Sequence, residues 1–225
     1  MKKQHNWKRA LMGMLAVILI AIGGLLIFNA PVTSWLVKQN QKASLAKVLQ
    51  QKKPAATASG MFDFNKVKSM TATRALKARV HNTSHAIGAV AIPAVHLALP
   101  ILVGLSDDSL STGGGTMRAN QVMGQGNYPL AGHYMTTKGI LFSPIAQVQK
   151  GDLVYLTNLK RVYRYRVYRK EIVNPTALYL VRNTKKAIVT LITCADGGIK
   201  RWAIRGRLTK TQPATEAALQ VFKLK

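Results

Sequence analysis

Beyond residue 80 the chain consists of short apolar runs separated by turn-forming residues. The runs at 86–92, 97–103 and 152–156 are mostly apolar, whereas residues 161–169 partly alternate between basic side chains and Val or Tyr. Short apolar runs are typical of buried strands, and partial alternation is typical of a strand with one face in water. Because such runs dominate residues 80–225 and helical patterns are few, the sequence predicts one mostly β domain, whose size and composition fit a closed or nearly closed barrel.

The single cysteine of the chain, Cys194, ends the apolar and β-branched run 189–194. The chain then breaks at Asp-Gly-Gly and resumes as a second strand-like run that opens with Lys200 and Arg201. A free cysteine is often a small buried hydrophobe, and that interpretation stays open for the cysteine alone. A thiol at a strand end beside a fixed cation has the surroundings of a nucleophile, because the cation favours the thiolate or stabilises an oxyanion.

A second candidate is His133, which follows a short apolar stretch through Gly132 and is therefore expected near a strand end. A lone histidine is more often structural, and no role is assigned to the other four, at positions 5, 81, 85 and 96. Cysteine, histidine and arginine together supply a nucleophile, a proton donor for a leaving amine, and a cation for developing negative charge. The three residues together therefore make chemical sense as a catalytic set.

The motifs around these residues resemble the class A sortases, the membrane-anchored cysteine transpeptidases of Gram-positive bacteria. The sequence TLITC ends at Cys194, AGH ends at His133, and Arg201 opens the next strand. Further matching segments follow in the same order, at 92–93, 99–101, 115–117, 141–144 and 173–176. The resemblance covers about residues 80–208, and it implies an eight-stranded sortase barrel in which Cys194 ends the seventh strand and Arg201 begins the eighth.

The resemblance also implies a substrate and a reaction. The substrate is a surface protein with a carboxy-terminal LPxTG signal, which is cut between Thr and Gly. Cys194 forms a thioester, His133 protonates the leaving amine, Arg201 holds the oxyanion or the substrate backbone, and a peptidoglycan-precursor amine then takes the acyl group. Two alternatives stay open: a membrane-anchored cysteine peptidase that only hydrolyses, and a cationic wall-binding protein without enzymatic activity.

Substrate-binding residues follow from the same resemblance. Leu178, Leu180 and Ile192 resemble the apolar wall that receives the Leu-Pro of the signal, with Ala131 at its floor and Thr193 on the approach to the thiol. Leu180 and Ile192 are equally compatible with ordinary core positions, because the interior of a small barrel is usually filled with side chains. The connection from residue 195 to 200 is short and leaves little room for a loop that selects the acceptor amine.

The amino-terminal region predicts a membrane anchor. Residues 10–28 are uncharged and apolar, and as a helix they would span roughly 28 Å, close to the thickness of the hydrocarbon layer. Residues 1–9 form a basic tail, which favours a cytoplasmic amino terminus and an extracellular catalytic domain. A cleaved signal peptide is the alternative, but Phe28 and Pro31 make a poor cleavage site.

Residues 29–79 are expected to form a basic extracellular stalk, with a helix over 34–51 and a flexible linker at 55–60. The chain carries 33 basic and 7 acidic residues, a net charge of +26. Such a charge favours anionic partners, and for an external protein these are lipid headgroups or acidic wall polymers. We expect no nucleic-acid partner, because the sequence has no zinc-finger, recognition-helix or RNA-binding pattern.

Neither a metal nor a cofactor is expected. Some class A sortases bind calcium through acidic loops, but the corresponding loops here, at 116–121 and 182–186, carry Arg118, Arg182, Lys185 and Lys186. Calcium requires several carboxylate oxygens, which these loops lack. The glycine run 113–115 is a loop or a close backbone approach, and it lacks the Lys-Ser/Thr of a phosphate-binding loop.

Overall fold

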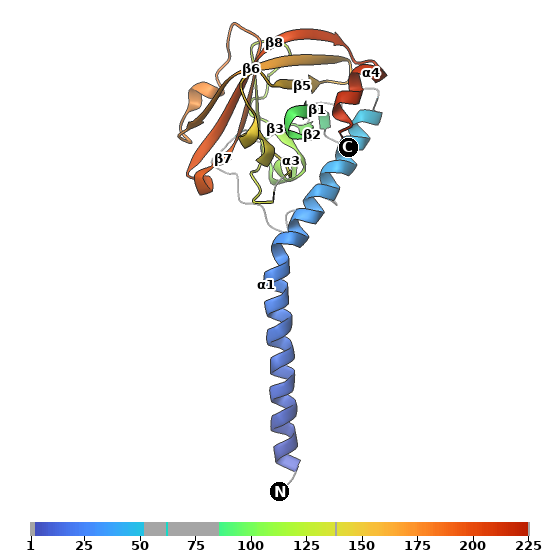
Figure 1. The fold of residues 1–225 in the computed structure, drawn as a ribbon, viewed down its shortest axis with the longest axis vertical. Coiled ribbons are helices and arrows are strands. Elements are labelled where there is room, and N and C mark those ends of the chain that lie inside the picture. Colours follow the sequence, from blue (N-terminus) through green and yellow to red (C-terminus); the bar gives the residue numbers. More distant parts are fainter. Residues whose placement is uncertain (1–2, 52–61, 63–85, 138, 225) are drawn as a thin grey trace.

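The computed structural model describes residues 3–51, 62, 86–137 and 139–224. Within these residues, strands close into a barrel in the order β1-β2-β3-β4-β7-β8-β6-β5 (Figure 1). The strands are β1 (Ala86–Ile92), β2 (Leu97–Leu102), β3 (Gly114–Thr116), β4 (Asn127–Ala131), β5 (Leu153–Thr157), β6 (Arg161–Val173), β7 (Ile188–Ala195) and β8 (Lys200–Pro213). The predicted mostly β, eight-stranded barrel is confirmed. The expected linker at 55–60 lies outside the described residues.

Strand pairing brings distant parts of the sequence together. β2–β3 and β4–β7 are parallel, and the other neighbouring pairs are antiparallel. The β6–β8 ladder runs from Arg161 opposite Pro213 to Val173 opposite Arg201, with shifts in register at two bulges. β7, which carries Cys194, lies between β4 and β8. It therefore pairs with the strand that precedes His133 and with the strand that carries Arg201.

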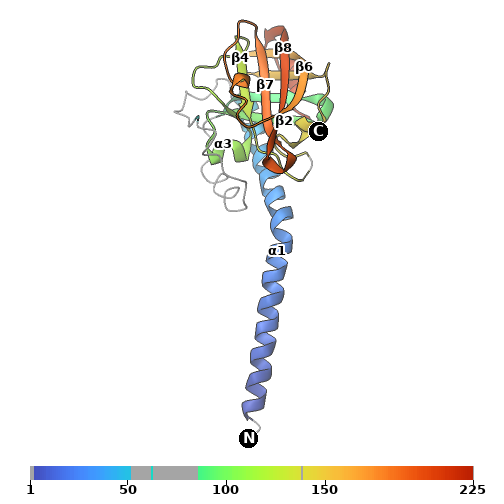
Figure 2. The ribbon, with the colours of Figure 1, turned by 90° about the vertical axis from the view of Figure 1, so that its left-hand side faces the viewer.

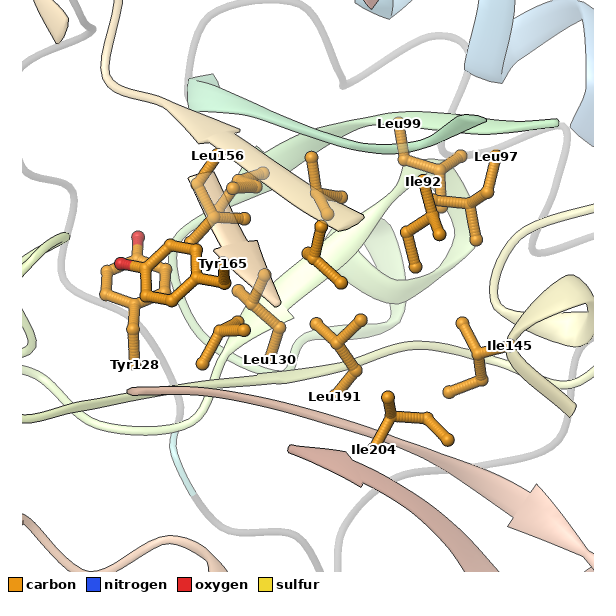
Figure 3. Close-up of a cluster of buried hydrophobic side chains, with 14 of the residues drawn as sticks. Ile92, Leu97, Leu99, Tyr128, Leu130, Ile145, Leu156, Tyr165, Leu191 and Ile204 are labelled. Atoms are coloured by element: carbon orange, nitrogen blue, oxygen red, sulfur yellow. The ribbon is translucent and has the colours of Figure 1, made fainter. Parts of the chain in front are cut away.

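The inside of the barrel is filled by apolar side chains, including Leu130 of β4, Leu191 of β7 and Ile204 of β8 (Figure 3). Tyr128 and Tyr165 also lie in this core, where burial raises the pKa of both phenols and keeps them neutral. Successive side chains of a strand point to opposite faces, so the residues next to these core positions project outward. On the neighbouring strands β4, β7 and β8 the outward set is Asn127, Ala131, Thr190, Ile192, Cys194, Arg201, Ala203, Arg205 and Arg207.

Short helices close the ends of the barrel and cover parts of its outer surface. They are η2 (Pro93–Val95), α3 (Asp107–Thr112), η3 (Ser143–Gln147), η4 (Leu178–Leu180), η5 (Asp196–Gly198), α4 (Glu216–Leu219) and η6 (Gln220–Phe222). Phe222 is fully buried against Ala89 and Ala91 of β1, so the carboxy terminus is tied to the barrel. η4 lies over the outer face beside β7, where it forms part of the site described below.

A single helix, α1 (Lys3–Gln50), joins the predicted anchor to the predicted stalk helix. It continues through Pro31, which cannot donate an intrahelical hydrogen bond, and the helix changes direction near its middle (Figure 1). No helix in the described part of the chain is long and apolar enough to count as a membrane span. The transmembrane helix expected at 10–28 is therefore not confirmed and stays a prediction.

The two halves of α1 have different surroundings. Large apolar side chains of the first half are exposed, among them Leu11, Leu15 and Leu19. The second half lies along the barrel (Figures 1 and 2), and Val37 and Val48 are buried there. The described part of the expected stalk, up to residue 51, thus packs on the catalytic domain. This contact was not predicted from the sequence.

Candidate active site

Two of the three predicted catalytic residues lie on the adjacent strands β7 and β8, and the third, His133, follows two residues after the end of β4. Cys194 of β7 lies directly opposite Arg201 of β8. In the parallel β4–β7 pair, Ala131 lies opposite Ile192, and the Gly132 N–H donates to the Ile192 carbonyl at 3.1 Å. Continuing this register by two residues places His133 level with Cys194. Because adjacent strands are about 4.8 Å apart, the three residues form one row across the end of the outer face.

The turn between β7 and β8 fixes the pairing of Cys194 with Arg201. η5 fills this turn, where Gly197 and Gly198 have φ angles of 62° and 99°. The Arg201 Nη1 donates to the carbonyls of Gly198 and Lys200 at 2.6 and 2.8 Å, which orients the guanidinium over the turn. Cys194 is partly exposed, so its thiol is within reach of a substrate.

The backbone that carries His133 is held from two sides. The Phe142 N–H donates to the His133 carbonyl at 3.0 Å, and the Phe142 ring packs so closely on Gly132 that a Cβ at this position would overlap it. The Thr193 hydroxyl donates to the Gly132 carbonyl at 2.8 Å. Thr193 is 2% exposed, so it ties the end of β4 to the end of β7. Position 132 therefore requires glycine, because any larger side chain would overlap the Phe142 ring.

A buried apolar cluster lies beside Cys194, on the side of β7 and β8 that faces away from the barrel core. Leu180 of η4, Ile192 and Ala203 form a buried cluster, with the partly buried side chains of Met117, Val173, Ala177 and Val181 packed against it. Ala131 belongs to a neighbouring cluster with Leu105 and Leu110, which Met117 also contacts. Leu178 is 66% exposed and stays outside both clusters. The predicted residues Leu180 and Ile192 are thus together, whereas Leu178 lies at the edge.

Asn127, which the sequence analysis missed, holds the segment before β7 in place. Its buried side-chain amide donates to the carbonyls of Leu180 and Arg182 at 2.7 and 2.9 Å, and its carbonyl oxygen accepts from the Thr190 hydroxyl at 2.8 Å. Every polar atom of this amide is therefore used, as a buried amide requires. A lone Asn at the start of a strand gives no signal of such a role, because its partners are 53 to 63 residues away.

Arg118 links the two loops that the sequence analysis compared with calcium-binding loops. Its Nη2 donates to the Asn127 carbonyl at 2.7 Å and lies 3.4 Å from the Asn183 Oδ1. The Asn183 Oδ1 also accepts from the Asn127 N–H at 3.2 Å. The cation that links these two loops is thus an arginine side chain of the protein itself.

Comparison with known proteins agrees with this geometry. The sortase domain family matches residues 90–209. Sortase A of Listeria monocytogenes is 37% identical over 213 residues, which cover 90% of this chain and 93% of that protein. Sortase A of Streptococcus agalactiae is 34% identical over 241 residues, covering 100% of this chain and 96% of that protein.

A solved structure shows the same fold. The crystal structure of Listeria monocytogenes sortase A superposes with a TM-score of 0.61 at 40% identity, and the match covers 63% of this chain and 100% of that one. The domain match and the two relatives extend over the barrel and the row of Cys194, His133 and Arg201. The chain therefore belongs to the sortase family of cysteine transpeptidases, and its similarity to sortase A proteins over most of its length assigns it to class A.

Proposed function

We propose that this sortase cleaves LPxTG-type signals of surface proteins between Thr and Gly and transfers the acyl group to a peptidoglycan-precursor amine. The observation that carries the proposal is that Cys194 and Arg201 face each other on adjacent strands, that His133 follows the neighbouring strand β4, and that an apolar cluster lies beside the thiol. A nucleophile, an acid and a cation on rigid strands are suited to acyl transfer. No cofactor enters the reaction.

In the first step, the Cys194 Sγ attacks the Thr carbonyl as a thiolate, and Arg201 stabilises the oxyanion or holds the substrate backbone. The C–N bond then breaks as His133 donates a proton to the departing Gly amine, which leaves a thioester on Cys194. In the second step, the acceptor amine attacks the thioester, His133 takes its proton, and the thiolate leaves. Water in place of the amine gives the hydrolytic alternative.

The apolar cluster of Leu180 and Ile192 is proposed to receive the Leu-Pro of the signal. Ala131, which is buried, and Leu178, which is exposed, are proposed to border this cluster. Thr193 contributes by holding the strand ends together through its bond to Gly132. Binding the signal along η4 would bring its Thr carbonyl toward Cys194, because Ile192 is two residues before the thiol on the same face.

The first half of α1 is proposed to anchor the chain in the membrane, with the amino terminus in the cytoplasm and the barrel outside the cell. The exposed apolar side chains from Leu11 to Ile22 support this, since a run of this kind is unfavourable in water. Lipid would then be the partner of this half of the helix.

The proposal is tested with the full chain in detergent micelles, a fluorescent LPxTG peptide and an added amine, with products weighed by mass spectrometry. The expected product is the peptide truncated after Thr and joined to the amine. Truncated free acid alone, at every amine concentration, would identify a hydrolysing peptidase. No product, together with no reaction of the thiol with an alkylating reagent, would support the cationic wall-binding protein instead.

A further inference from the structure

The outer face of the β6–β8 ladder carries basic residues directly opposite one another. Arg164 lies opposite Lys210, Arg166 opposite Arg207, and Arg169 opposite Arg205. Inward positions of β6 hold core residues such as Tyr163, Tyr165 and Val167, so the arginines between them project outward. We call these six residues the basic ladder. Its members repeat about every 7 Å along a strand and about every 5 Å across the pair.

Like charges at directly opposite positions destabilise a sheet. On this face, Arg169 forms an ion pair with Glu171 at 2.8 Å. The other ladder arginines contact neutral groups: the Arg164 Nε lies 3.3 Å from the Thr209 hydroxyl, and the Arg166 Nη1 lies 3.3 Å from the Gly151 carbonyl. These contacts orient the guanidinium groups without neutralising them.

Tyr168 lies among the arginines of the ladder. The guanidinium carbons of Arg205 and Arg207 lie 5.8 and 5.4 Å from its ring centre. Two cations already occupy the surroundings of this aromatic ring, which leaves it poorly suited to stack on a nucleic-acid base. The ladder therefore presents regularly spaced positive charges but no aromatic side chain that is suited to bind a nucleic-acid base.

The position of the ladder separates it from the membrane. Much of β6 and β8 lies on the side of the barrel that is remote from the amino terminus of α1 (Figures 1 and 2). If the first half of α1 anchors the chain, as proposed above, the bilayer that holds it lies at the other end of the molecule. The two strands that carry the ladder then lie on the far side of the barrel from the lipid headgroups.

We propose that the basic ladder binds a phosphodiester-linked polymer on the outer side of the membrane. A flexible chain with one negative charge per repeat can place successive phosphates between facing cations, and the arginine fork binds phosphate oxygens in pairs. Binding of the chain relieves the repulsion that the folded sheet retains. The ladder continues on the same face of β8 as Arg201, so the bound polymer runs toward the active-site end of the barrel.

The test uses the full chain in nanodiscs of neutral phosphatidylcholine and a fluorescent poly(glycerol phosphate) chain as the probe. The ladder variant is Arg166→Gln with Arg207→Gln. The control variant is Lys38→Gln with Lys42→Gln, which removes the same charge from exposed positions of α1. At about 0.1 M salt we expect the ladder variant to bind the polymer roughly tenfold more weakly, and the slope of log affinity against log salt to fall by about 1.4.

Two further measurements separate the proposal from its alternatives. Cleavage of a short LPxTG peptide should be unchanged in the ladder variant, and its melting temperature should be equal or higher because one directly opposite repulsive pair is removed. Equal loss of polymer binding in the ladder and control variants would overturn the proposal, since only net charge would then matter. Tighter ladder-dependent binding of single-stranded DNA, or of phosphatidylglycerol vesicles, would overturn it in favour of a nucleic acid or a membrane.

Discussion

At the scale of single residues, the proposed chemistry depends on the thiol of Cys194. We expect Cys194→Ala to abolish both cleavage and transfer of an LPxTG peptide, because removing the nucleophile removes the covalent path. The fold should persist, since the side chain is only partly buried and alanine fits a strand end. Product formation by mass spectrometry and the melting temperature are the two measurements. Retained cleavage in this variant would exclude Cys194 as the nucleophile.

Arg201 and Arg205 lie on the same face of β8, and only Arg201 lies opposite Cys194. Arg205 lies opposite Thr190 and near the Tyr168 ring. We expect Arg201→Lys to lower kcat/KM by about a hundredfold, because a point charge does not replace a two-pronged donor.

The matched control for Arg201 is Arg205→Lys, for which we expect a change of less than about threefold. Steady-state kinetics on the same peptide compare the two variants. If Arg205→Lys were the more damaging change, the oxyanion role would move from Arg201 to Arg205.

Single residues were predicted from the sequence where a local motif marks them, and missed where their partners are distant. The strand-turn-strand pattern around Cys194 identifies the thiol and Arg201, and the Gly-His pair identifies His133. Asn127 and Phe142 have no such signal, because each acts through contacts that exist only after the strands pair. Their roles follow from the register of β4 and β7, which no local pattern specifies.

At the scale of elements, Arg118 joins the loop before β4 to the loop before β7 by donating to Asn127 and Asn183. The Arg118 guanidinium between these loops takes the position of a bound metal ion, and its positive charge would repel calcium. We expect the transfer rate to be the same, within about twofold, with excess chelator and with millimolar calcium. A several-fold rise on adding calcium that chelator reverses would contradict this, and would mean that ligands exist outside these two loops.

Strands were predicted well where they are long and apolar. β1 matches the expected range 86–92, β2 ends one residue earlier than expected, and β5 is shifted by one residue at both ends. β6 extends to Val173 rather than to residue 169, because its partner β8 continues to pair with it as far as Arg201. β3 was not predicted as a strand, since the three residues Gly114–Thr116 have no alternating pattern and pair only because β2 and β4 lie on either side.

At the scale of the whole molecule, α1 connects the proposed anchor to the catalytic barrel by direct packing. Val37 is buried with Ile140 and Leu141, in the segment that follows His133. The Ser34 and Thr137 hydroxyls are 2.7 Å apart, and the Gln41 Oε1 accepts from the Leu141 N–H at 3.1 Å. No sequence pattern predicts this contact, because the apolar residues of 34–51 are compatible with any packed helix. Because α1 holds the segment that follows His133, a movement of the helix would also move His133.

The strongest test of this connection is Val37→Asp in the full chain. A carboxylate at this fully buried position costs roughly several kcal/mol if the contact is kept, so we expect α1 to separate locally from residues 134–141. The barrel should stay folded, because its core cluster does not include Val37. His133 would then be held less firmly, which slows proton transfer, whereas the surface of Leu180 and Ile192 is unaffected.

The expected result of Val37→Asp is therefore a fall in kcat of about tenfold with KM nearly constant, measured with the same LPxTG peptide. Val32→Asp is the matched control, because it introduces the same substitution at an exposed position of the same helix. A rise in KM alone would assign the contact to substrate binding. Equal kinetics in the two variants would mean that α1 only tethers the barrel, and that the packing of Val37 on the segment after His133 has no part in positioning the catalytic row.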